Sequence, residues 1–394
     1  MTERRWRLPL SIQASATQAS WTGVRLMVGY RAIEGGANPL FLGLMASAFA
    51  LPALVAALPA GRVSDRLGGS IVATTGLVVA AIGVTVTLVF PSLPVLLVAA
   101  AVIGLGHIFI MVGQQTFVAH ASSRGSSDAA FGTLTAAASI GQLIGPPTVT
   151  IIASLLIFSG SSTVPNTTVG LLVCLGFTAI AMPVIFFLRS ADSEMRTARS
   201  TTPAPAIRTL PLLKTPGLWQ SLVVSGAVLV TVDLMYAFVP VWAVEQGISA
   251  TAVGLLLALR AAVSVVSRFG LTRLVDRFGR KSLIIVSIAA ASAGLIALPF
   301  VGLWGAIPVM IGLGLGLGIP QPLTMAWVTS LTPRSTHGAV LGMRLTSNRL
   351  AQISLPLAVG AIAAPLGVIG IFWSNALLLL GAIAVMSRSD RGDT

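Results

Sequence analysis

The sequence predicts an all-α membrane protein with twelve transmembrane helices arranged as two pseudo-symmetric six-helix bundles. Three observations support this fold class. First, 55% of the 394 residues are hydrophobic and only 9% are charged, whereas soluble domains carry about 25% charged residues. Second, apolar runs of about 20 residues recur along the chain, and each could cross the roughly 30 Å hydrocarbon layer as a helix. Third, the second half repeats residues of the first at a nearly constant spacing.

The apolar runs give twelve predicted spans. The first is too polar for the apolar region of a signal peptide, so we expect it to be retained. Loops between the spans are short, except after the sixth. The predicted spans cover residues 9–30, 39–60, 70–90, 94–117, 129–158, 168–188, 217–242, 251–271, 282–303, 306–330, 338–363 and 365–386.

Basic residues indicate the orientation, because short loops rich in Arg and Lys stay on the cytoplasmic side. With both termini inside, the cytoplasmic segments hold 18 of the 24 basic residues, and the external loops hold only Arg31. We therefore expect a multi-pass protein of the cell (inner) membrane with cytoplasmic termini. The net charge of +13 follows mostly from this topology, so nothing in it calls for a nucleic-acid partner.

The two halves of the chain are diverged copies of one another. A shift of 210 or 211 residues superposes identical residues, and a stretch rich in charge, Ser, Thr and Pro separates the halves. This predicts a first bundle at 1–188, a cytoplasmic linker at 189–216 and a second bundle at 217–394. The superposed pairs are Glu34 and Glu245, Gly36 and Gly247, Gly43 and Gly254, Asp65 and Asp276, Gly68 and Gly279, Gln142 and Gln352, and Pro146 and Pro356.

A charged loop, Gly-x-x-x-Asp-Arg-x-Gly, joins the second and third spans. Two six-helix halves with this loop resemble the major facilitator superfamily, in particular its bacterial drug/proton antiporter branch. The resemblance implies that each loop acts as a cytoplasmic latch between conformations, with its aspartate held by arginines and by a helix N-terminus. The alternative is that the basic residues serve topology only. The matching residues are Gly61, Asp65, Arg66 and Gly68, with Asp276, Arg277 and Gly279 in the second copy, where Thr272 replaces the leading glycine.

A second motif of that family, Gly-x-x-x-Gly-Pro on the fifth span, is typical of its antiporters and exporters. Here Gly141, Gly145 and Pro146 match, while Val149 and Thr150 stand where two more glycines are usual. The motif favours export, and close helix packing is the alternative role.

The fourth span lacks an arginine that drug exporters of the family carry. Ala100 occupies that position. His107, near the middle of the same span, could substitute for it, or could be a hydrogen-bonded packing residue.

Polar side chains form stripes on two predicted spans. On the first span these side chains recur every three or four residues and share one helical face. This pattern predicts either a cavity lining or a polar seam between helices, and its members are Ser11, Ser15, Gln18, Thr22 and Arg25. We expect Leu26 and Met27, off this face, to contact lipid. Candidate substrate-binding residues on the two stripes and the fourth span are Gln18, Thr22, Arg25, His107, Arg344, Asn348 and Gln352.

Asp233 is the only carboxylate well inside a predicted span. It lies about nine residues from the outer end of the seventh span, and Arg260 lies about nine residues from the outer start of the eighth, so both are roughly 13 Å deep. The carboxylate would stay ionised beside the arginine and bind a proton when separated from it and desolvated. The pair is thus a candidate proton-coupling site, with a static ion pair as the alternative.

No catalytic cluster accompanies these residues. The spans contain neither grouped carboxylates nor a metal-binding pair, so we expect no enzyme activity, no cofactor and no metal. The sequence predicts a monomeric secondary carrier that exports small amphipathic compounds in exchange for protons. The alternatives are an importer of a small organic anion, favoured by the excess of arginine over aspartate in the spans, and a receptor on the same fold.

Overall fold

The computed structural model describes residues 4–121, 127–155, 163–197, 215–331 and 337–388. Throughout these ranges the chain is almost entirely helical, and no β-strand occurs in them. Long helices are expected, because in a bilayer each backbone N–H and C=O must find its partner within its own segment. The all-α prediction is confirmed.

The chain divides into two compact units. The first comprises Met1–Ala37, Ala48–Thr202 and Ser249–Ala258, and the second comprises Asn38–Ser47, Pro203–Ile248 and Leu259–Thr394. Each unit therefore contains a short segment from the other sequence repeat. The simpler division into bundles at 1–188 and 217–394 stays a prediction.

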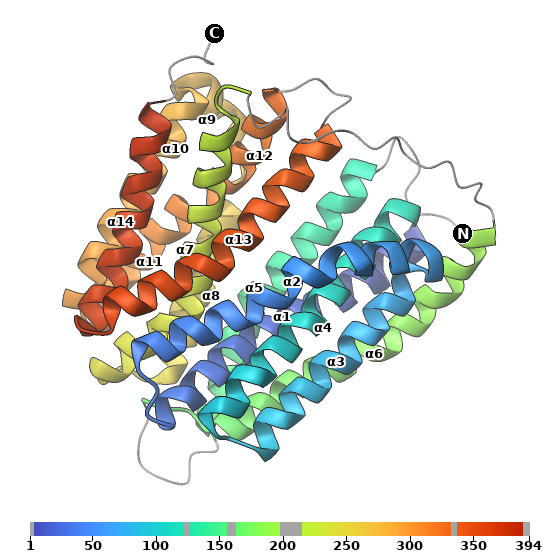
Figure 1. Cartoon of the computed structure of the whole chain (residues 1–394), viewed down its shortest axis with the longest axis horizontal. Helices are drawn as coiled ribbons and strands as arrows, with labels where there is room; N and C mark the ends of the chain where they lie inside the picture. Colours follow the sequence, from blue (N-terminus) through green and yellow to red (C-terminus); the bar gives the residue numbers. More distant parts are fainter. Residues whose placement is uncertain (1–3, 122–126, 156–162, 198–214, 332–336, 389–394) are drawn as a thin grey trace. The chain divides into compact units, whose positions relative to one another are not determined.

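The first unit is built mainly from six helices. Helix α1 packs against α5 and α6, and α3 packs against α4 (Figure 1). Their bounds are α1 (Arg4–Glu34), α2 (Pro39–Leu67), α3 (Gly69–Val89), α4 (Leu93–Ala121), α5 (Ser127–Leu155) and α6 (Thr167–Thr197). Helix α6 runs into the predicted linker as far as Thr197, and most of the remainder of that linker lies outside the described residues.

Glycines set the close packing of α3 on α4. Gly69 and Gly76 lie seven residues apart on α3, and Gly106 and Gly113 lie seven apart on α4. A Cβ on Gly76 would lie 2.6 Å from the carbonyl oxygen of Gly106, and one on Gly113 would meet the carbonyl of Gly69. The two backbones touch along this line because neither has a side chain there.

The second unit is centred on α7. Most of the apolar stretch of α7 is buried, and the helix packs against α13 and α14, while α10 packs against α11 and α14. The bounds are α7 (Leu218–Glu245), α8 (Ala250–Val266), α9 (Leu271–Phe278), α10 (Arg280–Ala297), η2 (Leu298–Phe300), α11 (Leu303–Gly318), α12 (Pro320–Ser330), α13 (His337–Ala363) and α14 (Gly367–Ser387).

Each of the twelve predicted spans is mostly helical where the structure describes it. In those residues nine helices are long and apolar enough to cross a membrane, counting α11 with α12 as one, and the bent pair α8 and α9 would be a tenth. Helices α1 and α13 have 31 and 27 residues but are not among the nine. They carry the two polar stripes, which lower their hydropathy.

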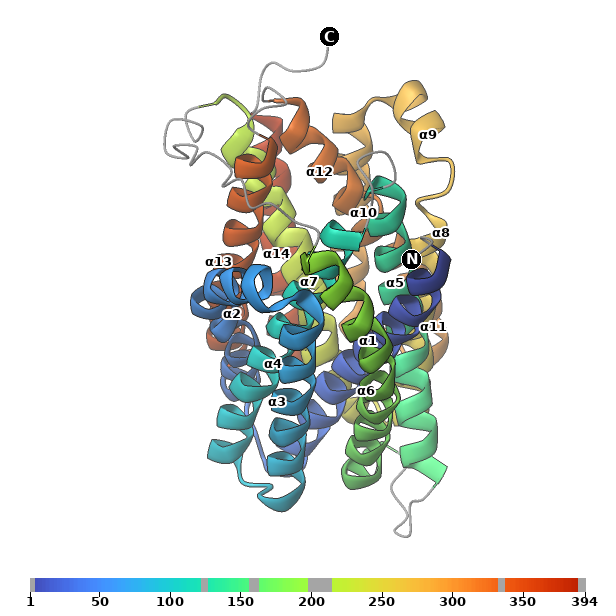
Figure 2. The ribbon, with the colours of Figure 1, turned by 90° about the vertical axis from the view of Figure 1, so that its right-hand side faces the viewer.

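The eighth predicted span, 251–271, is interrupted in the structure. Helix α8 ends at Val266, and α9 follows at an angle of 67° (Figure 2). Gly270, before α9, has φ 77°, a left-handed conformation that side chains other than glycine rarely adopt. The turn at Gly270 therefore ends the straight span several residues earlier than the hydropathy indicates.

The sequence repeat is present in the backbone as well. Gly36 after α1 has φ 77°, and Gly247 after α7 has φ 67°. At both turns the residue after the glycine donates its N–H to the carbonyl five residues earlier, over 2.9 Å in the first copy and 2.8 Å in the second. This is the Schellman ending of a helix. The glycines that superpose at a shift of 211 therefore end their helices with the same type of turn.

The helices that follow these turns begin in the same way. The side-chain oxygen of Asn38 accepts the N–H of Phe41 at 2.8 Å, and the hydroxyl of Ser249 accepts the N–H of Ala252 at 3.3 Å. Each is a residue that favours the N-cap position. The repeat therefore extends from the end of one helix to the start of the next.

Two glycine crossings complete the repeat. Gly43 on α2 lies against the backbone of Pro356 on α13, and its counterpart Gly254 on α8 lies against the backbone of Pro146 on α5. A Cβ on Gly43 would be 2.5 Å from the carbonyl oxygen of Pro356, and one on Gly254 would be 2.9 Å from that of Pro146. Because the prolines are also counterparts, the two crossings are equivalent contacts.

We expect Gly43→Ala to lower stability, because backbone on both sides leaves the new methyl group little room to move. Overpacking of this kind costs about 1–3 kcal/mol. Gly61→Ala is the matched control on the same helix, since a Cβ there meets nothing within 4 Å and alanine favours a helix by about 0.5–1 kcal/mol over glycine. Thermal unfolding of both purified variants checks the prediction, and equal melting temperatures would contradict it.

Candidate transport site

Asp233 on α7 is bound to a polar chain on α13. The Nε2 of Gln352 donates to its Oδ2 over 2.6 Å, and the Oε1 of Gln352 accepts an N–H from Arg349 over 2.8 Å. Arg349 also interacts electrostatically with Asp233. Two hydrogen bonds thus connect the carboxylate of Asp233, the amide of Gln352 and the guanidinium of Arg349.

This chain of polar groups lies near the middle of its helices. Asp233 is twelve residues before the end of α7, and Gln352 is eleven before the end of α13, which places them about 17–18 Å from those ends. Asp233 is half-buried and Gln352 is 9% exposed. A carboxylate at this depth needs partners, because apolar surroundings penalise its charged form.

Arg260 on α8 contacts Tyr236, which lies one turn after Asp233 on α7. It is 2% exposed, and it donates from Nη2 to the hydroxyl of Tyr236 over 3.4 Å with its charge 5.9 Å from the ring centre. Tyr236 follows Asp233 by three residues and so lies on the same side of α7. The predicted pairing of Asp233 with Arg260 stays a prediction, and sequence reasoning did not identify Gln352 as the amide bound to Asp233.

The rest of the α13 stripe is also enclosed. Asn348 is 5% exposed, and its Oδ1 has no hydrogen-bond partner among the described residues. Its position is opposite Gly226 of α7. Arg344, one turn earlier, is half-buried, and its Nε likewise lacks a partner in the described part of the chain. These groups remain candidates for binding.

On α1, part of the polar stripe forms a seam with α5. The hydroxyl of Ser15 donates to the carbonyl of Ala137 on α5 over 2.8 Å. Thr22 is 2% exposed and donates to carbonyls of its own helix. Thr22 is therefore placed as a packing group, whereas Gln18 is half-buried and makes no side-chain hydrogen bond with another described residue.

The fifth-span motif packs on this seam. A Cβ on Gly141 would meet the carbonyl of Ser15, and one on Gly145 would be 2.6 Å from both the carbonyl oxygen of Ala19 and the hydroxyl of Thr22. The two glycines therefore allow close packing of α5 on α1, and the part of the motif in export stays a prediction. Pro146, next along α5, faces the Gly254 crossing.

The expectation that Leu26 and Met27 contact lipid is wrong. Both are fully buried, and Met27 faces Gly170 of α6. Helix α1 is packed on most sides from its middle to its end, so hydropathy alone did not distinguish a lipid-facing side.

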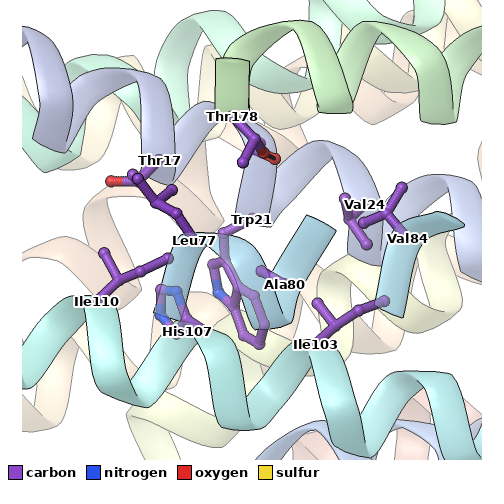
Figure 3. Close-up of a pocket in the computed structure, with 11 residues that line it drawn as sticks. Thr17, Trp21, Val24, Leu77, Ala80, Val84, Ile103, His107, Ile110 and Thr178 are labelled. Carbon is purple, nitrogen blue, oxygen red and sulfur yellow. Dashed lines mark hydrogen bonds between the residues drawn. The ribbon is translucent and has the colours of Figure 1, made fainter. Parts of the chain in front are cut away.

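Arg25 and His107 lie in an aromatic cluster of the first unit. His107 on α4 stacks on Trp21 of α1 with ring centres 3.8 Å apart and planes 5° apart (Figure 3). Phe49 of α2 meets the same indole edge-on at 5.6 Å. The Arg25 guanidinium carbon is 5.4 Å from the Trp21 ring centre and 6.0 Å from that of Phe49. The sequence indicated Arg25 and His107 as candidate site residues, but not the rings of Trp21 and Phe49.

A second network on α1 was also missed. The Nε2 of Gln114 on α4 donates to Gln13 over 2.6 Å and to Thr17 over 3.2 Å. All three side chains are buried. Gln13 and Thr17 lie on the opposite side of α1 from the stripe, and their spacing of four residues was the one signal that could have found them.

The charged loops turn at equivalent glycines. Gly68 precedes α3 with φ 102°, and Gly279 precedes α10 with φ 76°. Asp65 is exposed, and its Oδ1 lies 3.8 Å from Nε2 of His120 at the end of α4. Asp276 is exposed and has no hydrogen-bonded or ionic partner among the described residues.

The remaining loop residues lie beside these aspartates. Gly61 is half-buried, and Arg66 and Arg277 are exposed. Arg277 also contacts the ring of Phe278, 5.3 Å from its centre. The latch stays a prediction.

Comparison with known proteins gives the family. A family model described as Major Facilitator Superfamily matches residues 10–314 and 234–392. The chain belongs to the major facilitator superfamily. It is therefore a multi-pass membrane transporter by family, one of a class that handles small-molecule substrates in a lipid bilayer.

Solved structures of superfamily members share the fold. A crystal structure of the nucleoside transporter NupG is 12% identical over 97% of this chain and 98% of that chain, with a TM-score of 0.77. A bacterial homologue of the human lysosomal transporter Spinster, in an inward-facing and occupied conformation, is 14% identical over 98% of this chain and 96% of that chain, with a TM-score of 0.74. No curated protein sequence matches the chain. At these identities the likeness concerns the fold.

A double-mutant cycle tests the link between Asp233 and Gln352. Asp233→Asn removes the charge of the acceptor of the 2.6 Å hydrogen bond and Gln352→Leu removes its donor, so the double variant should lose less stability than the sum of the single losses. We expect a coupling of at least about 0.5 kcal/mol in the free energy of unfolding.

The control cycle replaces Gln352→Leu with Thr346→Ala, because exposed Thr346 bonds only to its own helix. Its combination with Asp233→Asn should be additive. If the Gln352 cycle were additive too, the hydrogen bond would contribute nothing to stability.

Proposed function

We propose that the protein is a proton-coupled exporter that exchanges protons for small amphipathic compounds by alternating access. The observation that carries the proposal is the mid-helix chain from Asp233 through Gln352 to Arg349. A carboxylate that keeps such partners stays ionised, and one that loses them in an apolar setting takes up a proton. A proton-driven carrier needs a group that changes charge in this way.

Arg260 is a second cation in the same unit. It donates to Tyr236, which lies one turn after Asp233 on α7. A conformational change that brought Arg260 against Asp233 would favour proton release, because a nearby opposite charge lowers the pKa of a carboxylate. In this proposal Asp233 carries the proton and Arg260 is its electrostatic partner.

The direction of transport is proposed from the fifth helix. Gly141, Gly145 and Pro146 are typical of exporters in the superfamily, and the two glycines hold α5 directly against α1. We place the protein in the inner membrane as a monomer with both termini cytoplasmic, which agrees with the distribution of basic residues.

Import of a small organic anion is the second candidate. Arg25 is 6% exposed and Arg260 is 2% exposed, and Arg344 and Arg349 are half-buried. Cations enclosed in membrane helices normally face a partner or a cavity. A transported anion would be one such partner.

Asp233→Asn should separate the two functions of a coupled carrier. Asparagine keeps the size and stays neutral, so transport against a gradient driven by pH should be abolished, while exchange of substrate without a pH gradient should continue. Reconstituted vesicles, with a dye substrate identified from a resistance screen, measure both activities. Uphill transport by Asp233→Asn at the wild-type rate would show that Asp233 is not the coupling site.

The same vesicles distinguish antiport from symport. A proton/substrate antiporter accumulates the substrate when the vesicle interior is acidic, because protons that leave the vesicle drive the substrate in. Uptake of an organic anion together with protons would instead support the import candidate.

Asp65→Asn should slow transport without changing insertion. The substitution removes the charge of the proposed latch, and an exposed charge of this kind is worth only a few tenths to one kcal/mol, so we expect a loss of roughly twofold to fivefold in rate. Arg273→Gln removes another exposed loop charge outside the Asp-Arg pair and should leave the rate unchanged. Full activity of a well-inserted Asp65→Asn protein would remove the latch from the mechanism.

A further inference from the structure

Three helices of the first unit bring aromatic rings together around one indole. Trp21 lies on α1, Phe49 on α2 and His107 on α4, and Arg25 lies one turn beyond Trp21. His107 covers a face of the indole at 3.8 Å, and Phe49 meets it edge-on. A planar, face-to-face contact with an imidazole shows that this indole accepts a second flat ring.

Backbone packing holds this cluster in place. Gly104, one turn before His107 on α4, lies against the backbone of Phe49, where a Cβ would meet the Phe49 carbonyl. Phe49 therefore lies closer to α4 than any side chain at residue 104 would permit. Its ring, the indole and the imidazole are positioned by three helices rather than by one loop, which gives a precise and rigid surface.

Arg25 provides a charge beside the rings. It is 6% exposed, and its contacts with Trp21 and Phe49 are made through its charge over the ring faces. The N–H bonds of a guanidinium lie in its plane and suit a carboxylate, to which two of them can donate together. A flat surface and an anion-binding group thus occur side by side.

We propose that Trp21 stacks on a planar aromatic ring of the transported compound, that Arg25 binds its anionic group, and that His107 occupies the indole face which the ring takes. This inference rests on the proposed function and names a substrate class within it, namely aromatic carboxylates and similar amphipathic anions. Trp21 and Phe49 are then specificity residues in addition to Arg25 and His107.

The small size of the neighbouring cavity explains the role of His107. Trp21, His107 and Ile103 help to line a cavity with only about 20 Å³ of room for the centre of a water-sized sphere (Figure 3). This space suits one or two water molecules and excludes an aromatic ring. In this proposal a ring enters the space when the imidazole moves aside, so one stacked pair replaces another.

Binding of matched probes to the full chain in lipid nanodiscs tests the proposal. Benzoate and cyclohexanecarboxylate have the same charge and similar size, but only benzoate has an aromatic face. Calorimetric titration should show that the wild type binds benzoate roughly threefold to tenfold more tightly, the difference expected for one aromatic pair. Benzylamine, which reverses the charge, should not compete with benzoate.

Two variants should change benzoate binding in different ways. Trp21→Leu should remove the preference for benzoate, so that both carboxylates bind with equal affinity. His107→Ala should strengthen benzoate binding by about twofold to tenfold, because no imidazole stack has to be broken. A merely structural role of His107 would weaken binding instead.

Trp6→Leu is the matched control on the same helix. Trp6 also meets a phenylalanine edge-on, Phe117 at 5.8 Å, and an arginine charge, Arg7 at 5.8 Å, but no imidazole stacks on it among the described residues. This variant should keep the wild-type preference for benzoate. Its melting temperature and that of Trp21→Leu show whether loss of packing alone alters binding.

Any of four results would overturn the proposal: no benzoate binding by the wild type, equal affinity for the two carboxylates, equal effects of Trp21→Leu and Trp6→Leu, or weaker benzoate binding by His107→Ala. No pH gradient is used, so these outcomes are independent of proton coupling.

Discussion

A charge that lies deep in a membrane helix must be stabilised by its own protein, because the hydrocarbon offers neither water nor counter-ions. The second unit meets this requirement for Asp233 with an amide from Gln352, which in turn accepts from Arg349. Arg260 is held by the hydroxyl and ring of Tyr236. These contacts connect α7 with α13 and with α8.

The first unit stabilises its buried charge by different chemistry. Arg25 lies over the rings of Trp21 and Phe49, which attract a cation through their electron-rich faces and retain its charge. Hydrogen-bonded partners can change with protonation, whereas ring faces cannot. The duplicated halves share turns and helix crossings but have different polar interiors, one held by hydrogen bonds to a carboxylate and one by aromatic rings around a guanidinium.

The features that could be predicted from sequence are those that repeat. The positions of the helices follow from long apolar runs, and the equivalent turns at Gly36 and Gly247 follow from superposing the halves. The break before α9 could not be predicted, since it depends on the left-handed conformation of Gly270, and glycines are frequent throughout this chain. The failure at Leu26 arose because a buried face and a lipid-contacting face are both apolar.

The site was predicted less completely than the fold. Asp233 could be found because a carboxylate is rare in an apolar span, but Gln352 is 119 residues away, and only the packing of α13 on α7 makes them neighbours. Trp21 was not identified from the sequence, because nothing in its spacing indicates a binding role. Only the structure shows that a histidine from another helix stacks on it.

The glycine crossings at Gly43 and Gly254 have a consequence for how the protein responds to its surroundings. The nearest neighbours of Gly43 are backbone atoms of α13, and those of Gly254 are the Thr150 hydroxyl and the backbone of α5, so no ionisable group takes part at either crossing. Acid, salt and the charge of a ligand therefore have nothing to act on at these points. The crossings serve as fixed reference points against which the titratable groups elsewhere in each unit can change their charge.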